Sequence, residues 1–421
     1  MDSGMPDEHD QPTGAGSQQR GHSHGHSHGH SHGHSHGPTP RLHDAAQRAL
    51  WPVVIVLAVA TVIATLLMWP NGSNGFEDPM LLDADPASAT IVVVDPVPCG
   101  YEPTQPCTLI GFELNDGAHA GEFGAFEHGA NSPLDPGDKI TVTSFESVDG
   151  DVVYSFFDYQ RGWPMLWLFG LFAVSVIALG RWRGVGAIAG LAFSLLVIVM
   201  FTLPAILAGS NAIIVAVVSA SLIAYSALFL AHGFNAATAV ALLSTLASLV
   251  LTAILATAFV GMTNLTGLTD DSSLLLAGLA SGIDPRGILL AGILIGSLGV
   301  LDDVTVTQVS AVWQLKNVQP DLTTAGLMKP ALRIGRDHIS STVNTLFLAY
   351  AGAALPLILL FTEAGQSIGN VLSREIVATE FVRTLVGSIG LVASVPLSTW
   401  LAAVVLAHRP AAAAAKVRTS K

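Results

Sequence analysis

Two adjacent acidic residues interrupt a long apolar run in the last third of the chain. The stretch "IGSLGVLDDVTVTQVSAVWQL" carries Asp302 and Asp303 among Gly, Leu, Val and Ile. An ionised Asp at the centre of a membrane-crossing helix costs about 2.5 to 3.5 kcal/mol, so such a side chain faces protein or water and often belongs to an ion or proton pathway. After Asp303, a polar stripe follows at helical spacing: Thr307, Ser310 and Gln314. This pattern predicts an ion or proton site at Asp303.

The two acids cannot both belong to that stripe on a regular helix. Adjacent residues on an α-helix point about 100° apart, so Asp302 joins the stripe only if the helix breaks. Gly296 and Gly299 lie within two turns, and a break there would resemble the discontinuous helices that line transporter binding sites. The alternative is that the span from Gly287 to Leu315, about 44 Å if helical, overshoots the bilayer and leaves the acids near an interface.

The next apolar span has a matching polar face. The stretch "RIGRDHISSTVNTLFLAYAGAALP" places Asp337, Ser341 and Asn344 at helical spacing, with Tyr350 further along. Two antiparallel polar stripes could line a pathway, whereas the alternative is interhelical hydrogen bonding that needs no ligand. Before this span, residues 319 to 338 are expected to form a short amphipathic helix on the inner membrane surface. Asp337 is expected to pair with Arg333 or Arg336.

The composition is that of a membrane protein. Of the 421 residues, 51 % are hydrophobic and 12 % are charged, against about a quarter charged in soluble domains. Runs of 18 or more apolar residues, long enough to cross the bilayer, recur after residue 160. Eight spans are predicted: Trp51 to Trp69, Pro164 to Leu179, Gly184 to Ala208, Ala212 to Ala231, Ala236 to Gly261, Gly287 to Leu315, Ser340 to Phe361 and Thr384 to Ala407. The predicted fold class is therefore an α-helical polytopic membrane protein of about eight transmembrane helices, with seven of them in a membrane domain over residues 164–407.

Basic residues predict the orientation, because cytoplasmic flanks retain Lys and Arg. With the N-terminus inside, 13 of the 18 basic residues are cytoplasmic. The outer segments keep the other five: Lys139, Arg161, Arg286, Arg374 and Arg383. We therefore expect a bacterial plasma-membrane protein with both termini in the cytoplasm, the C-terminal tail being residues 408–421. The glycine pairs Gly186 with Gly190, Gly278 with Gly282, and Gly292 with Gly296 allow close helix packing and leave a homo-oligomer open.

Residues 70–162 form the only sizeable region outside the predicted spans and tails. The short runs "ATIVVVD", "CTLIGFEL", "DKITVTSF" and "DVVYSFFDY" predict an extracytoplasmic β-domain, a barrel or a sandwich. Much of the net charge of −13 lies here, and this acidity excludes nucleic acid as a partner. Cys99 and Cys107, the only cysteines, are expected to form a disulfide on this oxidising side; zinc binding is the weaker alternative, because no further ligands lie nearby.

The N-terminal region, residues 1–48, is predicted to be a disordered cytoplasmic tail that precedes the first span at 51–69. It carries "HSHGHSHGHSHGHSHG", with eight histidines at every second position: His22, His24, His26, His28, His30, His32, His34 and His36. Neutral imidazole binds zinc and nickel, and a flexible chain can wrap several rings around one ion. Zn or Ni is thus the one candidate cofactor, as a buffered or sensed metal. The alternative is a low-complexity tail that has no such role in the cell.

The membrane region resembles the YibE/F family of bacterial integral membrane proteins. The resemblance rests mainly on "GSLGVLDDVTVTQVSAVWQL" and "RIGRDHISSTVNTLFLAYAGAALPLILLF", with weaker support from "FFDYQRGWPMLWLFGLF", "GRWRGVGAIAGLAFSLLVI" and "LFLAHGFN". In the family pattern one Asp follows a glycine-rich run, and it falls on Asp303, whereas Asp302 stands where an apolar residue is common. The resemblance implies a polytopic plasma-membrane protein with a suspected permease role and no known substrate.

Three functions compete at this point. The first is a secondary transporter or permease for an unknown small solute or ion, such as a divalent metal, with Asp303 as the ion or proton site. The second is a non-transporting scaffold or sensor that acts through the extracytoplasmic domain. An enzyme is not expected, because HExxH and Walker A patterns are missing from the sequence, and GxSxG occurs only as the GHSHG repeat of the histidine tract. The expected partners are the lipid bilayer and the transported solute.

Overall fold

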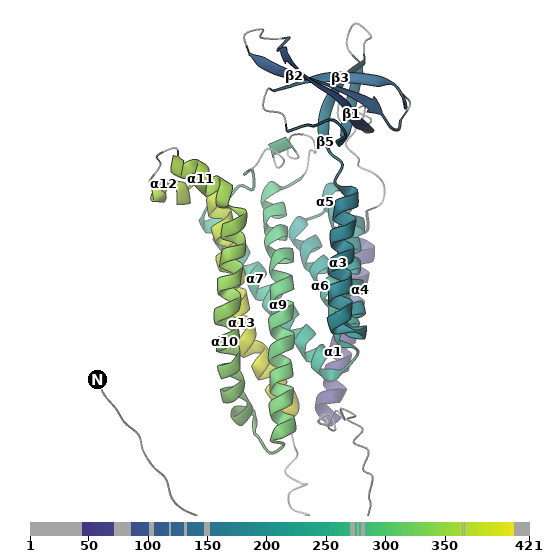
Figure 1. Cartoon of the computed structure of the whole chain (residues 1–421). Coiled ribbons are helices and arrows are strands. Elements are labelled where there is room, and N and C mark those ends of the chain that lie inside the picture. Colours follow the sequence, from purple (N-terminus) through teal and green to yellow (C-terminus); the bar gives the residue numbers. More distant parts are fainter. Residues whose placement is uncertain are drawn as a thin grey trace, which may run out of the picture. The chain divides into compact units, whose positions relative to one another are not determined.

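The computed structural model describes residues 44–70, 86–100, 105–117, 119–129, 133–146, 152–269, 274–275, 278, 283–363, 365 and 367–407. These residues belong to one unit that extends from Pro40 to Lys421. The histidine tract (residues 22–36), with its predicted metal ligands, lies outside the described residues, as does the tail 408–421. The described part is mostly helical, with one small sheet (Figure 1).

The sheet has five antiparallel strands in the order β3-β2-β1-β4-β5. Their bounds are β1 (Pro86–Pro98), β2 (Pro106–Leu114), β3 (Phe123–Gly129), β4 (Lys139–Glu146) and β5 (Val152–Tyr159). Alternate side chains of β2, Ile110, Phe112 and Leu114, are buried, which is the period-two pattern of a strand with one covered face. The terminal strands β3 and β5 meet through Phe126 and Phe156, whose ring centroids are 6.1 Å apart. The sheet is therefore curled toward a partly open barrel.

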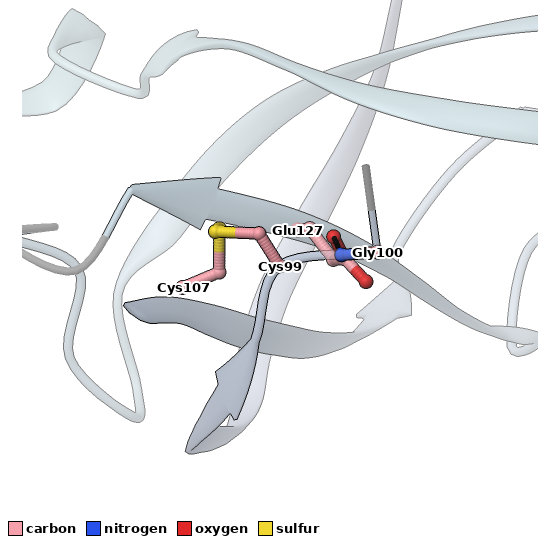
Figure 2. The surroundings of a disulfide bond; sticks show 4 residues. All are labelled: Cys99, Gly100, Cys107 and Glu127. Carbon is pink, nitrogen blue, oxygen red and sulfur yellow. Dashed lines mark hydrogen bonds between the residues drawn. A yellow bond between two sulfur atoms is a disulfide. The ribbon is translucent and has the colours of Figure 1, made fainter. Parts of the chain in front are cut away.

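A disulfide joins Cys99, just after β1, to Cys107 in β2. Both cysteines are buried, and the bond closes the turn between the two strands (Figure 2). The backbone N–H of the neighbouring Gly100 donates to Oε2 of Glu127 on β3 at 2.9 Å. The structure therefore contains the predicted disulfide between Cys99 and Cys107 and not the alternative zinc site.

The helical region begins with α1 and continues after the sheet. The helices are α1 (Asp44–Leu67), α3 (Gly162–Gly180), α4 (Trp182–Val197), α5 (Leu203–Leu207), α6 (Ala212–His232), α7 (Ala236–Met262), α9 (Pro285–Val318), α10 (Thr324–Ala353), α11 (Leu355–Glu363), α12 (Ile368–Leu372) and α13 (Glu375–Ala407), with a π-helical turn η1 (Ile198–Thr202) between α4 and α5. Within the described residues, seven helices are long and apolar enough to cross a membrane, and α10 with α11, bent by 57°, would be an eighth. This agrees with the predicted count.

Side-chain caps explain where several helices start. The Asn211 carboxamide oxygen accepts hydrogen bonds from the backbone N–H groups of Ile213 and Ile214, and the Asn235 oxygen accepts one from Thr238. Each cap satisfies N–H groups that have no partner inside the helix, so the chain turns sharply between α5 and α6 and between α6 and α7. These short turns place successive helices side by side.

Helices α6, α7, α9 and α13 form the centre of the helical region, with α4 on α6 and with α10 on α13 and α9 (Figure 1). Small residues allow the closest approaches. A Cβ at Gly186 would collide with the carbonyl of Leu230, and one at Gly190 would lie 3.2 Å from the Cα of Ala227. The expected close packing is confirmed for this glycine pair, at the contact of α4 with α6.

The structure corrects two predicted boundaries. The predicted surface helix over residues 319–338 is not separate, because α10 runs unbroken from Thr324, capped by Thr323, and buries Leu327, Ala331 and Gly335 along one face. The last span begins at Glu375 rather than at Thr384. Glu380 and Arg383 pair with each other within that helix, so their charges do not end it.

Candidate functional site

Helix α9 is one unbroken helix of 34 residues, from Pro285 to Val318. The carboxylate of its N-cap, Asp284, accepts a hydrogen bond from the Arg286 N–H at 3.1 Å, and Pro285 occupies the first helical position. The break considered at Gly296 and Gly299 does not occur. Asp302 and Asp303 therefore point to different sides of the helix.

One side of α9 packs against its neighbours, and its most deeply buried polar residues are Thr305 and Gln308. The hydroxyl oxygens of Thr305 and Thr245, on α7, lie 2.6 Å apart. The Gln308 amide nitrogen donates to the carbonyl of Ala331 on α10 at 2.8 Å and to the hydroxyl of Thr399 on α13 at 2.7 Å. Four helices are thus joined by hydrogen bonds through this packed face. Thr305 and Gln308 were not among the predicted site residues, because they are offset from the stripe that starts at Asp303.

The predicted stripe lies on the opposite, exposed side of α9. It continues a row of exposed glycines at the same three- and four-residue spacing, and we call the whole set the open track: Gly292, Gly296, Gly299, Asp303, Thr307, Ser310 and Gln314. At 1.5 Å per residue, the track is about 33 Å long. Small and polar side chains therefore line one exposed face of α9 for roughly the thickness of a bilayer's hydrocarbon core.

The two aspartates differ in their surroundings. Asp303 is exposed on the open track and lies close enough to His232, the last residue of α6, for an electrostatic interaction. Asp302 is half-buried, and its Oδ1 atom is buried without a hydrogen-bond partner in the described structure. Asp303 is the middle residue of the open track, eleven residues from Gly292 and eleven from Gln314.

Most of the predicted partner residues on α10 do not reach α9. Asp337, Ser341 and Asn344 are exposed, and no hydrogen bond or ion pair joins them to α9 in the described residues. The expected ion pair of Asp337 with Arg333 or Arg336 does not form either. Tyr350 is the exception, since a Cβ at Gly296 would lie 3.6 Å from its hydroxyl oxygen.

A cavity of about 630 Å³ lies where α9 and α13 begin and α10 ends. We call it the helix-end cavity. Gly292 and Tyr350 line it, so the open track starts at this cavity. Its other walls are mainly apolar, formed by side chains such as Ile288, Leu289 and Leu357. Cavities of this size and character are typical of small-molecule sites.

One face of α13 supplies the polar wall of this cavity. Ile376, Thr379, Glu380 and Arg383 follow each other at helical spacing and all line it. Nη1 of Arg383 donates to Oε1 of Glu380 at 2.8 Å, and each side chain keeps a little over a quarter of its surface exposed. Thr379 is 4 % exposed, and its hydroxyl oxygen has no hydrogen-bond partner in the described structure; the same is true of the buried Nε of Arg383.

The loop after α7 closes one side of the cavity, and Glu375 holds it in place. The Glu375 carboxylate accepts hydrogen bonds from the backbone N–H groups of Thr266 and Gly267 and from the Thr266 hydroxyl. Gly267 has φ +79°, and a Cβ there would collide with the carbonyl of Pro285. The loop is therefore fixed against the first residues of both α9 and α13.

Comparison with known proteins identifies the family. A family model described as YibE/F-like protein matches residues 168–408, which is more than half of the chain. The chain belongs to the YibE/F family. The YibE/F match covers α9, α10 and α13, and thus both the open track and the helix-end cavity, whereas the sheet and its disulfide lie outside it. No curated protein and no solved structure matches the chain.

Proposed function

We propose that this member of the YibE/F family is a multi-pass membrane protein that acts as a secondary transporter or permease for a small solute or ion. The observation that carries the proposal is the continuity of the open track, which runs from the helix-end cavity along about 33 Å of α9. A bilayer's hydrocarbon core is about 30 Å thick, so a track of this length would reach from one side to the other.

Contact with lipid alone would be energetically unfavourable for the open track. An ionised Asp303 in contact with hydrocarbon costs energy, as does Gln314, and the glycines would add exposed backbone. Helix α3, by contrast, has no buried residues and exposes Trp163 and Trp167, as a lipid-facing helix does. The track therefore requires water, a solute or another protein surface.

Flux through purified protein in liposomes tests the transport proposal. Proton movement would be followed with a trapped pH-sensitive dye, and Zn²⁺ or Ni²⁺ movement with a trapped metal-sensitive dye. We expect Asp303→Asn to reduce flux by about tenfold or more, because it removes the only charge on the track. Asp158→Asn, which removes an exposed carboxylate from β5, is the matched control. Equal flux in both variants would contradict a role for Asp303.

A second copy of the chain is the competing explanation for the open track, since Gly292 and Gly296 have the spacing that lets two helices approach. Gly299→Cys would introduce the only free thiol, because the native cysteines are joined. Oxidation in membranes should then leave the chain monomeric if the track is a solute path. An efficient disulfide-linked dimer would favour the homo-oligomer.

The histidine tract motivates the metal version of the proposal. It would collect Zn²⁺ or Ni²⁺ on the cytoplasmic side and deliver it for export. Deletion of residues 22–36 should then raise cellular zinc or nickel, and Asp303→Asn should do the same. Unchanged metal content and tolerance in both variants would remove metals from the candidate substrates while leaving other solutes.

We further propose the plasma membrane as the location, with both termini in the cytoplasm, on the strength of the distribution of Lys and Arg. A C-terminal alkaline phosphatase fusion should be inactive, because the enzyme needs the oxidising side to fold. The same enzyme inserted after residue 162 of a truncated chain should be active. The opposite pair of results would invert the topology.

A specific observation keeps the scaffold or sensor function as the second candidate. The curled sheet has a cavity of about 500 Å³ between β3 and β5, lined by Phe126, His128 and Tyr154 among others. If the protein acts through this cavity, replacing residues 70–162 by a short linker should abolish the cellular phenotype. Asp303→Asn should then be silent, which is the reverse of the result expected for a permease.

A further inference from the structure

The Glu380–Arg383 pair in the helix-end cavity uses little of its hydrogen-bonding capacity. A guanidinium has five N–H donors, and Arg383 directs one of its nitrogens to Glu380. In the described structure, its Nε is buried without a hydrogen-bond partner. Buried polar groups are nearly always satisfied by protein, water or a ligand, so this unused donor calls for an explanation.

A second buried group, beside the pair, has the same property. Thr379, one helical turn before Arg383, is 4 % exposed, and its hydroxyl oxygen has no hydrogen-bond partner in the described structure. Thr379, Glu380 and Arg383 all line the one cavity, together with Tyr350 from α10. One positive group, one negative group and a buried hydroxyl therefore lie on one face of α13, in a cavity whose other walls are mainly apolar.

Another arginine–carboxylate pair with the same spacing in the described residues lacks this setting. Asp158 and Arg161 are also an acid and an arginine three residues apart, with Nη1 and Oδ1 at 2.6 Å. Their side chains are 51 % and 60 % exposed, about twice the exposure of Glu380 and Arg383, and water can satisfy what the pair leaves unused. The hydrogen bond from Arg161, with a second from the Tyr159 N–H, lowers the pKa of Asp158, as expected for a simple surface pair.

We propose that the helix-end cavity binds a small zwitterion with an apolar body. Its oxyanion would lie against Arg383, its ammonium group against Glu380, and its apolar part against Ile288, Leu289 and Leu357. A ligand with one charge would add a net charge to a mainly apolar cavity, because Glu380 and Arg383 already balance each other. The inference rests on the proposed permease function, of which this cavity would be the entry or exit site, but binding is measured without flux.

Four related dipeptide probes separate the charges. Leucyl-leucine carries both charges, acetyl-leucyl-leucine the anion, leucyl-leucinamide the cation, and acetyl-leucyl-leucinamide neither. Binding of each would be measured by calorimetry on the full chain in phosphatidylglycerol nanodiscs. Leucyl-leucine should bind at least about tenfold more tightly than the other three, because it alone satisfies both charges. No binding of any probe at millimolar concentration, or equal binding of all four, would overturn the proposal.

Variants that remove one charge should change which probe binds best. A purely structural ion pair would not give this result. Arg383→Gln should make leucyl-leucinamide the best ligand, and Glu380→Gln should make acetyl-leucyl-leucine the best ligand. If a single variant does not fold, Glu380→Gln with Arg383→Gln leaves no charge unpaired and should bind the four probes within about threefold of one another. The control, Asp158→Asn with Arg161→Gln, should keep the wild-type order. A uniform loss for all probes in the single variants, with the order otherwise kept, would overturn the proposal.

The same chemistry occurs in a phosphatidylethanolamine headgroup, which joins an ammonium group to a phosphate. Adding this lipid to the nanodiscs should weaken leucyl-leucine binding if the headgroup occupies the cavity, and should not alter it if the ligand is a free solute. Either result supports a zwitterion site and identifies its source. Binding without leucyl-leucine flux in liposomes would leave this inference standing and count against the permease function.

Discussion

The two sides of α9 carry similar polar residues in very different surroundings. On the packed face, Thr305 and Gln308 are fully buried and hydrogen-bonded to three other helices. On the open track, Asp303 and Gln314 are exposed and have no hydrogen-bond partner in the described structure. Within one apolar helix, polar side chains thus divide into those that join helices and those that need water or a solute.

The largest effect is expected where a glycine is enclosed. A Cβ at Gly335 of α10 would lie 2.5 Å from Cγ1 of Val395 and 2.9 Å from Oε1 of Gln308. Gly335→Leu should therefore lower the free energy of unfolding by about 3 kcal/mol or more, through overpacking. Gly299→Leu, on the open track, has nothing within 4 Å of its Cβ and should change stability little. Unfolding in mixed micelles titrated with SDS measures both.

Measuring solute flux through Gly299→Leu gives a second test of the same comparison. Gly299→Leu should fold normally and yet reduce flux through liposomes, because its side chain would occupy the middle of the track. A folded Gly299→Leu protein with unchanged flux would separate the open track from transport. Equal destabilisation by both leucines would mean that the two sides of α9 are not as different as their packing indicates.

The sequence was sufficient to identify the polar stripe, but it did not show whether that face of α9 is buried or exposed. The spacing from Asp303 to Gln314 defines one helical face whatever surrounds it, and the glycine row that extends it is visible in the sequence too. Which face is covered depends on α7, α10 and α13, whose positions are set by long-range packing. A polar stripe therefore predicted a helix face, while its exposure and the missing contact with Asn344 required the structure.

Replacing Asp302 and replacing Asp303 should have different effects on the free energy of unfolding. Asp302 buries one carboxylate oxygen without a partner, and an unsatisfied buried polar group costs about 1 to 3 kcal/mol. Asp302→Leu should therefore raise the free energy of unfolding by about 1 kcal/mol or more. Asp303→Leu should leave it within about 0.5 kcal/mol. A loss of stability in Asp302→Leu would show that water or an ion satisfies that oxygen.

The two glutamines of α9 should show the next largest difference in unfolding free energy when each is replaced by leucine. Gln308→Leu removes hydrogen bonds to Ala331 and Thr399 and should cost about 1 to 2 kcal/mol in unfolding free energy. Gln314→Leu, on the open track, removes no hydrogen bond within the described structure and should cost less than about 0.5 kcal/mol. The same SDS titration measures both variants. Similar losses in the two would contradict the assignment of Gln308 as the buried joint between α9, α10 and α13.

The sequence indicated less about the helix-end cavity than about the polar stripe of α9. Tyr350 is the one predicted site residue that lines it. Glu380 and Arg383 lie just before Thr384, where the last span was predicted to begin, and neither was a predicted site residue. The structure extends α13 past them to Glu375, since the two charges pair with each other and Glu375 binds the loop after α7. Only the spacing of three residues between Glu380 and Arg383 could have suggested this.

The smallest effect is expected for the hydroxyl pair of the packed face. Thr245 and Thr305 lie 2.6 Å apart, yet each hydroxyl also lies within hydrogen-bonding distance of a backbone carbonyl on its own helix, that of Ala241 and that of Asp302. A hydroxyl has one proton, so one of the two can donate across the interface only by giving up its own carbonyl. A double-mutant cycle with Thr245→Val and Thr305→Val should therefore give a coupling of about 0.6 kcal/mol, the average for interhelical hydrogen bonds in membranes. A coupling above about 1.7 kcal/mol would mean that this pair, rather than Gln308, dominates the packed face.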